Sequence, residues 1–184
     1  MKVKEAVLEY RRYTCAEIES WDTDERFELI DGVIYVMASP SRAHQKISGS
    51  LFYQLYNFLK GKTCEVYSAP FAVYLDKNDT LVQPDIVVVC DKSKLTDSGC
   101  DGAPDLIVEI LSPSTSRHDK VTKLNRYLQA GVREYWIVDT EAKTVMVHIL
   151  ENEKYIAHAY DHTSTIPVNV LEGCEIIAGD VFAE

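Results

Sequence analysis

The chain of 184 residues is 46% hydrophobic and 26% charged, which is ordinary for a soluble globular protein, and its length favours one domain spanning residues 1–184. No apolar run approaches the roughly 20 residues of a membrane helix, and the first residues lack the apolar core of a signal peptide. We therefore expect a cytoplasmic protein without membrane contact. The formal net charge of −10 argues against a general nucleic-acid binder, since such proteins need a basic face.

Any basic surface must therefore be local. The densest group of cations lies in and just beyond one predicted helix and consists of Arg117, Lys120, Lys123, Arg126 and Arg133. Local positive charge of this kind can still guide an anionic ligand to a neighbouring site.

The cysteines are five in number and show no Cys-x-x-Cys spacing; they are Cys15, Cys64, Cys90, Cys100 and Cys174. An odd count without paired spacing predicts neither a disulfide framework nor a structural zinc site. The pattern favours a reducing compartment.

The N-terminal part of the sequence predicts a helix followed by a hairpin. Residues 1–20 have helical character, and Thr14 with Glu17 three residues later forms a capping-box pattern. In the next segment, the Asp31-Gly32 pair between two apolar runs is a strong signal of a β-hairpin. Glu28 lies in the first strand of this hairpin, where it is either an edge charge or part of a site.

Residues 43–60 fit an amphipathic helix that ends at Gly61. Its predicted buried face consists of Ile47, Leu51, Leu55 and Phe58, which recur at helical spacing. His44 points to the same side at the helix start, so it is either a packed core histidine or part of a site. Residues 64–75 then read as extended.

The second half of the chain predicts a strand that ends near residue 111, a helix from about residue 116 to Ala130, and a further strand after Gly131. Such a strand–helix–strand passage implies a parallel, right-handed crossover. Residues 144–160 form a hairpin pattern. We therefore predict an α/β fold with a mixed sheet flanked by helices 43–60 and 116–130, together with antiparallel hairpins.

Two apolar runs each carry one carboxylate at their centre, Asp85 in the run 81–90 and Glu109 in the run 106–111. Val, Ile and Leu on both faces indicate strands that are covered on both sides. A carboxylate there loses its hydration, which costs several kcal/mol unless a cation or hydrogen bonds replace the water. On neighbouring strands, a divalent ion would also relieve the repulsion between them, and hard oxygen ligands suit Mg²⁺ or Mn²⁺.

These residues resemble a known enzyme superfamily. Pro84-Asp85, followed by Glu109 on the next strand, is similar to the motif of the PD-(D/E)XK nucleases. Residues 28–48 and 104–139 resemble one group within it, the restriction endonuclease-like Uma-two family, and the resemblance covers most of residues 27–140. It implies a restriction-endonuclease-like core, a mixed sheet with a helix on each side, and metal-dependent hydrolysis of DNA.

The sequence departs from the superfamily pattern at one position. That pattern has a lysine two residues after the glutamate, where this chain has Leu111. The resemblance implies that the lysine has moved into the next helix, in a Lys-x-x-x-Tyr pattern that matches Lys123 and Tyr127. The predicted buried stripe of that helix consists of Val121, Leu124 and Leu128. Lys120 flanks this stripe more closely than Lys123 does and is the alternative catalytic lysine.

The resemblance implies a role for each residue of a DNA endonuclease that uses Mg²⁺ or Mn²⁺. Asp85, Glu109 and the main-chain carbonyl of Ile110 would hold the ion, which polarises the phosphate and activates a water. Lys123 would orient or deprotonate that water. Glu28 would be an outer ligand. Supporting contacts to the ligands or to the phosphate are expected from His44, Gln83 and Tyr127.

Other hypotheses remain open at this point. Asp85 could cap backbone amides, and Glu109 could form a structural ion pair with Lys123 or Arg126. The fold could serve as a catalytically silent module that binds nucleic acid or protein, or the site could hydrolyse another phosphate ester. A homodimer is one arrangement that would cut both strands of a DNA duplex.

Overall fold

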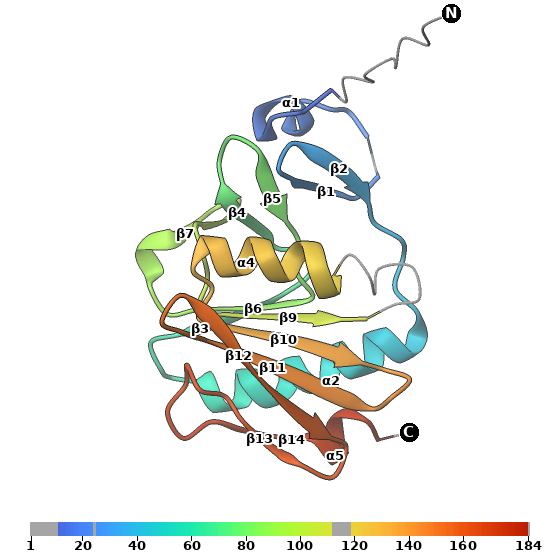
Figure 1. Cartoon of the computed structure of the whole chain (residues 1–184), viewed down its shortest axis with the longest axis vertical. Helices are drawn as coiled ribbons and strands as arrows, with labels where there is room; N and C mark the ends of the chain where they lie inside the picture. The colour runs from blue at the N-terminus through green and yellow to red at the C-terminus, as the bar shows by residue number, and fades with distance from the viewer. Residues whose placement is uncertain (1–10, 24, 112–118, 184) are drawn as a thin grey trace, which may run out of the picture.

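The computed structural model describes residues 11–23, 25–111 and 119–183, with the backbone alone described at 119 and 120. Two mixed β-sheets and two longer helices form the body of this part of the chain (Figure 1). The predicted α/β class, with a mixed sheet between helices, is confirmed. Within the described residues, no helix is long and apolar enough to cross a membrane.

The larger sheet contains the strands that carry the two predicted carboxylates. Its strands, in spatial order, are β12 (Lys154–Asp161), β11 (Thr144–Glu151), β10 (Glu134–Asp139), β9 (Leu106–Ile110), β6 (Ile86–Val89) and β3 (Glu65–Ser68). β9 and β10 are parallel, as the predicted crossover requires, and the other pairs are antiparallel. The predicted 144–160 hairpin forms the β11–β12 edge of this sheet.

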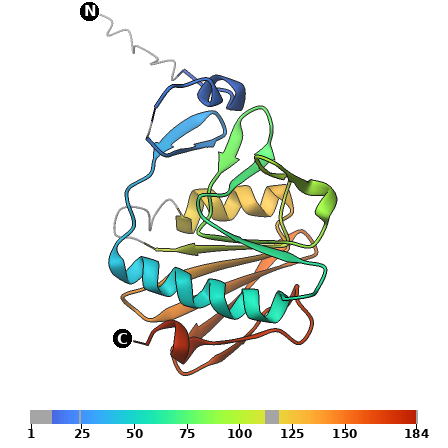
Figure 2. The same cartoon turned by 180° about the vertical axis from the view of Figure 1, so that it is seen from behind.

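Helices cover both faces of this sheet (Figures 1 and 2). Helix α2 (Arg42–Leu59) packs on one face, and helix α4 (Leu124–Ala130) on the other. Because successive strand residues point to opposite faces, one strand supplies both cores. Val88 packs under α2, for example, and its neighbours Val87 and Val89 pack under α4. The apolar runs in the sequence are therefore continuous because the strands are covered on both faces, as predicted.

A second sheet closes over the far side of α4. Its strands, in spatial order, are β2 (Val33–Val36), β1 (Phe27–Ile30), β5 (Thr80–Val82), β4 (Ala72–Asp76), β8 (Gly99–Asp101) and β7 (Leu95–Thr96). The predicted hairpin joins β1 to β2 through Asp31 and Gly32, at φ values of 51° and 74°. Left-handed backbone at both turn positions is the reason for the Asp-Gly preference.

The predicted extended segment 64–75 is divided between the two sheets. β3 belongs to the larger sheet and β4 to the smaller one, and residues 69–71 connect them. The chain returns through residues 83–85, between β5 and β6. The two crossings lie side by side, since the Ala69 N–H donates to the Asp85 carbonyl at 3.0 Å. Asp85 is thus placed where the sheets meet.

The remaining elements are short. They are α1 (Cys15–Glu19), η1 (Lys92–Lys94), η2 (Asp119–Lys123), β13 (Thr165–Pro167), β14 (Glu175–Ile177) and α5 (Ala178–Val181). Thr14 and Glu17 form the predicted capping box at the start of α1. β13, β14 and α5 extend the core beneath α2.

One helix differs from its prediction. Before α4, the segment η2 is a π-helix, in which the wider turn changes the direction of the side chains. Val121, predicted to be buried, is 54% exposed, whereas Lys123 is 3% exposed. The expected stripe of Val121, Leu124 and Leu128 is therefore wrong at its first member. Gly131 ends α4 in the left-handed conformation, as predicted.

The cysteines also differ from expectation. Cys64 and Cys90 form a disulfide that joins the adjacent strand ends of β3 and β6, and Cys15, Cys100 and Cys174 are free and buried. The prediction of unpaired thiols is wrong for this pair, because antiparallel pairing places two cysteines distant in sequence opposite each other.

Candidate active site

Asp85 and Glu109 lie opposite each other on adjacent strands. β6 and β9 pair antiparallel with Ile86 opposite Val108, so the next pair along is Asp85 and Glu109. The Ile110 N–H donates to Asp85 Oδ2 at 2.7 Å. The sequence alone could not show that these two strands are adjacent and in register. In the structure they are, and this pairing brings both carboxylates to one end of the sheet.

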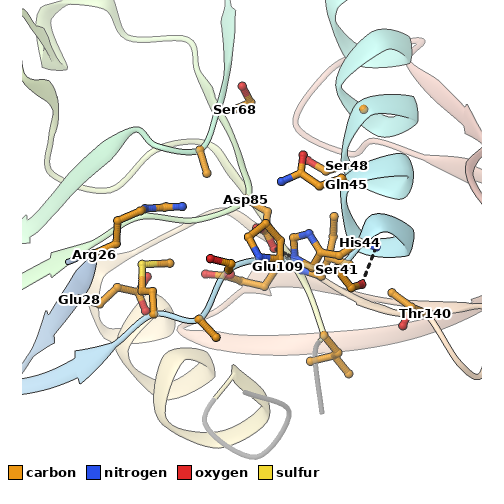
Figure 3. Close-up of a pocket in the computed structure, with 18 of the residues that line it drawn as sticks. Arg26, Glu28, Ser41, His44, Gln45, Ser48, Ser68, Asp85, Glu109 and Thr140 are labelled. Atoms are coloured by element: carbon orange, nitrogen blue, oxygen red, sulfur yellow. Dashed lines mark hydrogen bonds and ion pairs between the residues drawn. The ribbon is translucent and has the colours of Figure 1, made fainter. Parts of the chain in front are cut away.

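His44 approaches Asp85 from helix α2. Its Nε2 lies 3.1 Å from Asp85 Oδ2, and only 9% of the residue is exposed. Ser41 caps the helix by accepting the His44 N–H at 3.2 Å, which fixes the first turn (dashed line in Figure 3). Both side-chain contacts of Asp85 fall on Oδ2. Oδ1 therefore has no hydrogen-bond donor among the residues that the structure describes.

Lys123 joins Glu109 to Glu28. Its Nζ lies 2.8 Å from Glu109 Oε1 and 2.8 Å from Glu28 Oε2, and all three residues are at least 95% buried. Buried carboxylates and a buried ammonium lose most of their hydration. The direct ionic hydrogen bonds between Lys123 and the two carboxylates compensate for this loss. The helical segment after β9 thus brings a cation to the carboxylate on β9.

Tyr127 supports the same carboxylate from one helical turn further on. Its hydroxyl donates to Glu109 Oε1 at 2.7 Å, and the residue is fully buried. Burial, followed by the nearby charges of Glu109 and Glu28, raises the pKa of Tyr127 well above 10. The phenol therefore stays neutral and acts as a donor that holds Glu109 in one orientation. Its ring packs edge-on against Tyr135, with centroids 4.9 Å apart.

Gln83 forms hydrogen bonds to two neighbouring residues, Glu28 and Arg26. Its backbone N–H donates to Glu28 Oε1 at 2.9 Å, and its side-chain oxygen accepts from the Arg26 guanidinium at 3.1 Å. Gln83 thus positions both the Glu28 carboxylate and the Arg26 guanidinium. The contact to Glu28 could not be predicted from the sequence, because it uses the main chain.

These residues surround a cavity of about 520 Å³ where the two sheets and α2 meet. Figure 3 shows Gln45 and Ser48 of α2 on one side, Arg26 and Glu28 on the other, and Asp85 and Glu109 between them. Main-chain segments 35–41 and 68–69 contribute the remaining walls. The cavity therefore combines an acidic floor with polar and cationic walls.

The floor of the cavity is rich in carboxylates. Those of Glu28, Asp85 and Glu109 lie close to the ammonium of Lys123, and the Arg26 guanidinium lies on the wall of the same cavity. Carboxylate oxygens are ligands that a hard divalent cation prefers. Within the described residues, no three acidic, histidine or cysteine side chains are grouped closely enough to enclose an ion. An ion here would thus keep waters or substrate oxygens as further ligands, as Mg²⁺ usually does.

The structure brings most of the predicted site residues together. Those that lie in direct mutual contact or line the cavity are Asp85, Glu109, Ile110, Lys123, Glu28 and His44. Gln83 and Tyr127 contact these residues without lining the cavity. The side chain of the alternative lysine, Lys120, lies outside the described residues.

Sequence reasoning missed Arg26 and the cavity wall on α2. Arg26 sits one residue before β1, and nothing in its sequence context distinguishes it from a surface arginine. Gln45 and Ser48 are ordinary polar residues of an amphipathic helix. Ser48 follows His44 by four residues, so a helical wheel centred on His44 could have suggested it, whereas Gln45 comes directly after His44 and does not share its side.

The predicted basic cluster is largely neutralised. Lys123 is held by two carboxylates, Arg126 lies 3.4 Å from Asp31, and Arg133 lies 2.9 Å from Asp105. Arg117 and the side chain of Lys120 lie outside the described residues. The described members of this cluster therefore form ion pairs, and they do not form a free basic surface.

Comparison with known proteins identifies relatives of unassigned function. The chain is 33% identical over 103 residues to "Uncharacterized protein slr1290" of Synechocystis, an alignment covering 56% of this chain and 54% of that protein. It is 26% identical over 118 residues to "Uncharacterized protein sll1609" of the same organism, covering 62% and 67%. The chain thus spans about half the length of the first of these relatives.

A solved structure has a similar fold. The crystal structure of "a putative nuclease belonging to DUF820" from Anabaena variabilis matches with a TM-score of 0.75 and 20% identity, covering 91% of this chain and 95% of that one. The sequence pattern of the Uma2 family, described as "Putative restriction endonuclease", matches residues 9–179. The chain therefore belongs to the Uma2 family of restriction endonuclease-like proteins.

Proposed function

We propose that the protein is a nuclease that hydrolyses phosphodiester bonds in DNA with the help of Mg²⁺ or Mn²⁺. The observation that carries this proposal is the opposition of Asp85 and Glu109 at the floor of a polar cavity, with Lys123 against Glu109. Membership of the Uma2 family supports the same chemistry.

The donor set fits a hard divalent cation. Asp85 Oδ1 and the Glu109 carboxylate would hold it, with the Ile110 carbonyl as a third ligand, because the Ile110 N–H already faces Asp85 and a strand residue presents both main-chain groups to the same side. When bound, the ion would polarise the phosphate and lower the pKa of a coordinated water.

The protein residues then have separate tasks. Lys123 would orient the attacking water and offset the negative charge that develops on the phosphate. Glu28 and Tyr127 would keep Lys123 and Glu109 in position, and His44 would hold Asp85 from the opposite side. These tasks require side chains that are buried and held in place, and the hydrogen bonds described above hold these side chains in that way.

A cleavage assay tests this proposal. Purified protein is incubated with end-labelled single-stranded and duplex DNA in Mg²⁺, in Mn²⁺ or in chelator, beside Asp85→Asn and Glu109→Gln. We expect cleavage of at least one substrate with either metal, none in chelator, and a loss of about 10²-fold or more in each variant. Binding of DNA without any metal-dependent cleavage would instead favour a catalytically silent binding module.

A further inference from the structure

The carboxylates of the proposed site lie at the floor of the cavity between the two sheets and α2. Glu28 and Glu109 are 3% and 5% exposed. A phosphate must reach them at the floor of a cavity of about 520 Å³, where the two sheets and α2 meet. A flexible single strand can bend one nucleotide into such a cavity, whereas duplex DNA, with a persistence length of about 150 bp, is stiff on this scale. A single nucleotide can enter.

Helix α2 supplies a wall suited to a nucleobase. Gln45 carries an amide that can donate to and accept from a base edge, and Phe52 supplies an aromatic ring to the same cavity. Between them, Gly49 leaves open space, since a Cβ built there would meet no heavy atom within 4 Å. The wall thus offers a flat gap beside a ring and a hydrogen-bonding group.

The aromatic surface continues along α2 beyond the cavity. Tyr56 follows Phe52 by one turn, and the two rings stack with centroids 5.9 Å apart and planes 18° from parallel. Tyr56 is 51% exposed. Exposed aromatic rings in line with an active site are the usual platform for successive unpaired bases. We call Gln45, Gly49, Phe52 and Tyr56 the α2 stripe.

The charge of the protein points the same way. Binding to a duplex draws its affinity from many phosphate contacts, which need a basic surface. This chain has a net charge of −10, and Arg126 and Arg133 are already paired with carboxylates. Stacking of unpaired bases on α2 would supply affinity that does not depend on phosphate contacts.

We propose that the substrate is single-stranded DNA, or the unpaired end of a duplex, with one nucleotide inside the cavity. Its phosphate lies at Asp85 and Glu109, its base lies over Gly49 beside Phe52, and the next base stacks on Tyr56. This inference rests on the proposed nuclease activity and names the substrate class of the same site.

The first test compares substrates of one sequence: a single strand, a blunt two-strand duplex, and a duplex with a single-stranded flap. Cleavage is measured in Mn²⁺, and binding is measured by fluorescence anisotropy with Ca²⁺ in its place. We expect the single strand and the flap to be bound and cut at least about tenfold better than the blunt duplex. Equal binding and cutting of the blunt duplex would overturn the inference.

The second test alters the α2 stripe. Gly49→Leu fills the open gap and suits a helix interior better than glycine, so folding should be preserved. It should abolish most cleavage while calorimetry still detects the metal. Tyr56→Ala should weaken binding of the single strand by about five- to one-hundredfold. If both variants bind and cut the single strand like the wild type, the inference is wrong.

Matched controls lie on the same helix. Asn57→Leu and Tyr53→Ala change exposed residues that do not line the cavity within the described part of the chain, and we expect both to behave like the wild type. The outcomes also separate the two proposals. A wild type that cuts duplex and single strand equally keeps the nuclease and rejects only this substrate class, whereas one that cuts no DNA rejects both.

Discussion

Lys123 Nζ lies 2.8 Å from Glu109 Oε1, although the two residues belong to different elements. In the PD-(D/E)XK pattern, the lysine lies two residues after the glutamate on the same strand. Leu111 takes that place here, and it is buried against the α4 core. The helical segment before α4 brings the ammonium to the same carboxylate from a different direction. The geometry therefore keeps the lysine–glutamate pair while the sequence pattern changes.

Replacement of this lysine should affect both activity and stability. Lys123→Met removes the cation between Glu28 and Glu109 and leaves two buried carboxylates without it. We expect the free energy of unfolding to fall by about 3–5 kcal/mol, because buried charges without a partner are costly. Cleavage should fall by about 10²- to 10⁴-fold. Urea unfolding and initial rates would measure the two effects.

A double variant separates charge balance from catalysis. Glu28→Gln combined with Lys123→Met removes one carboxylate together with the ammonium, so part of the lost stability should return without any recovery of cleavage. If the double variant regains activity as well, Lys123 has only a structural role.

Removal of one hydroxyl tests the positioning of Glu109. Tyr127→Phe keeps the ring that packs against Tyr135 but removes the 2.7 Å hydrogen bond to Glu109. We expect a loss of about 1.5–3 kcal/mol in unfolding free energy, as for a hydrogen bond to a charged group. The rate of cleavage should fall more than the affinity for DNA. An equal loss of rate and affinity would contradict a positioning role.

The alkaline limit of stability should also depend on this residue. The pKa of Tyr127 is raised in the folded protein, mainly by burial, so its stabilising contribution is complete below pH 10 and is lost as the pH rises further. Tyr127→Phe should therefore lose less stability above pH 10 than the wild type does. Thermal unfolding from pH 8 to 11 would detect the difference, and parallel curves would contradict it.

His148 should control part of the acid sensitivity. Burial lowers the pKa of its imidazole below 6.5, and its ring stacks on Tyr135. The unfolded chain binds the proton more readily, so this contribution to stability is present above pH 6.5 and is lost as the pH falls through the lowered pKa. His148→Phe keeps a stacking ring without the titration. We expect its melting temperature to fall less than that of the wild type between pH 7 and 5.

Much of the fold could be predicted because local chemistry decides it. Asp31-Gly32 requires a left-handed turn, and Gly131 ends a helix in the same conformation. Asp85 and Glu109 could be selected as candidates because a carboxylate in a doubly covered strand is costly unless a cation or hydrogen bonds replace its water. In each case a short segment of sequence contains the whole physical reason.

Other features depend on contacts between distant segments. The π-helix at residues 119–123 turns Lys123 inward, and a regular helical wheel therefore placed Val121 wrongly in the buried stripe of that helix. Arg26 and Gln45 line the cavity only because β1 and α2 meet there. No periodicity within either segment distinguishes them from solvent-exposed polar residues.

The measurement that tests the central claim most directly is a calorimetric titration of Mn²⁺ into the wild type and Asp85→Asn, with and without single-stranded DNA. Asparagine preserves the shape of the side chain and its contact with the Ile110 N–H, but it removes the charge. The proposed site predicts one Mn²⁺ per chain in the wild type and no binding in the variant. A wild type that binds no metal at millimolar concentration, or a variant that binds it equally well, would contradict a metal site at Asp85 and Glu109.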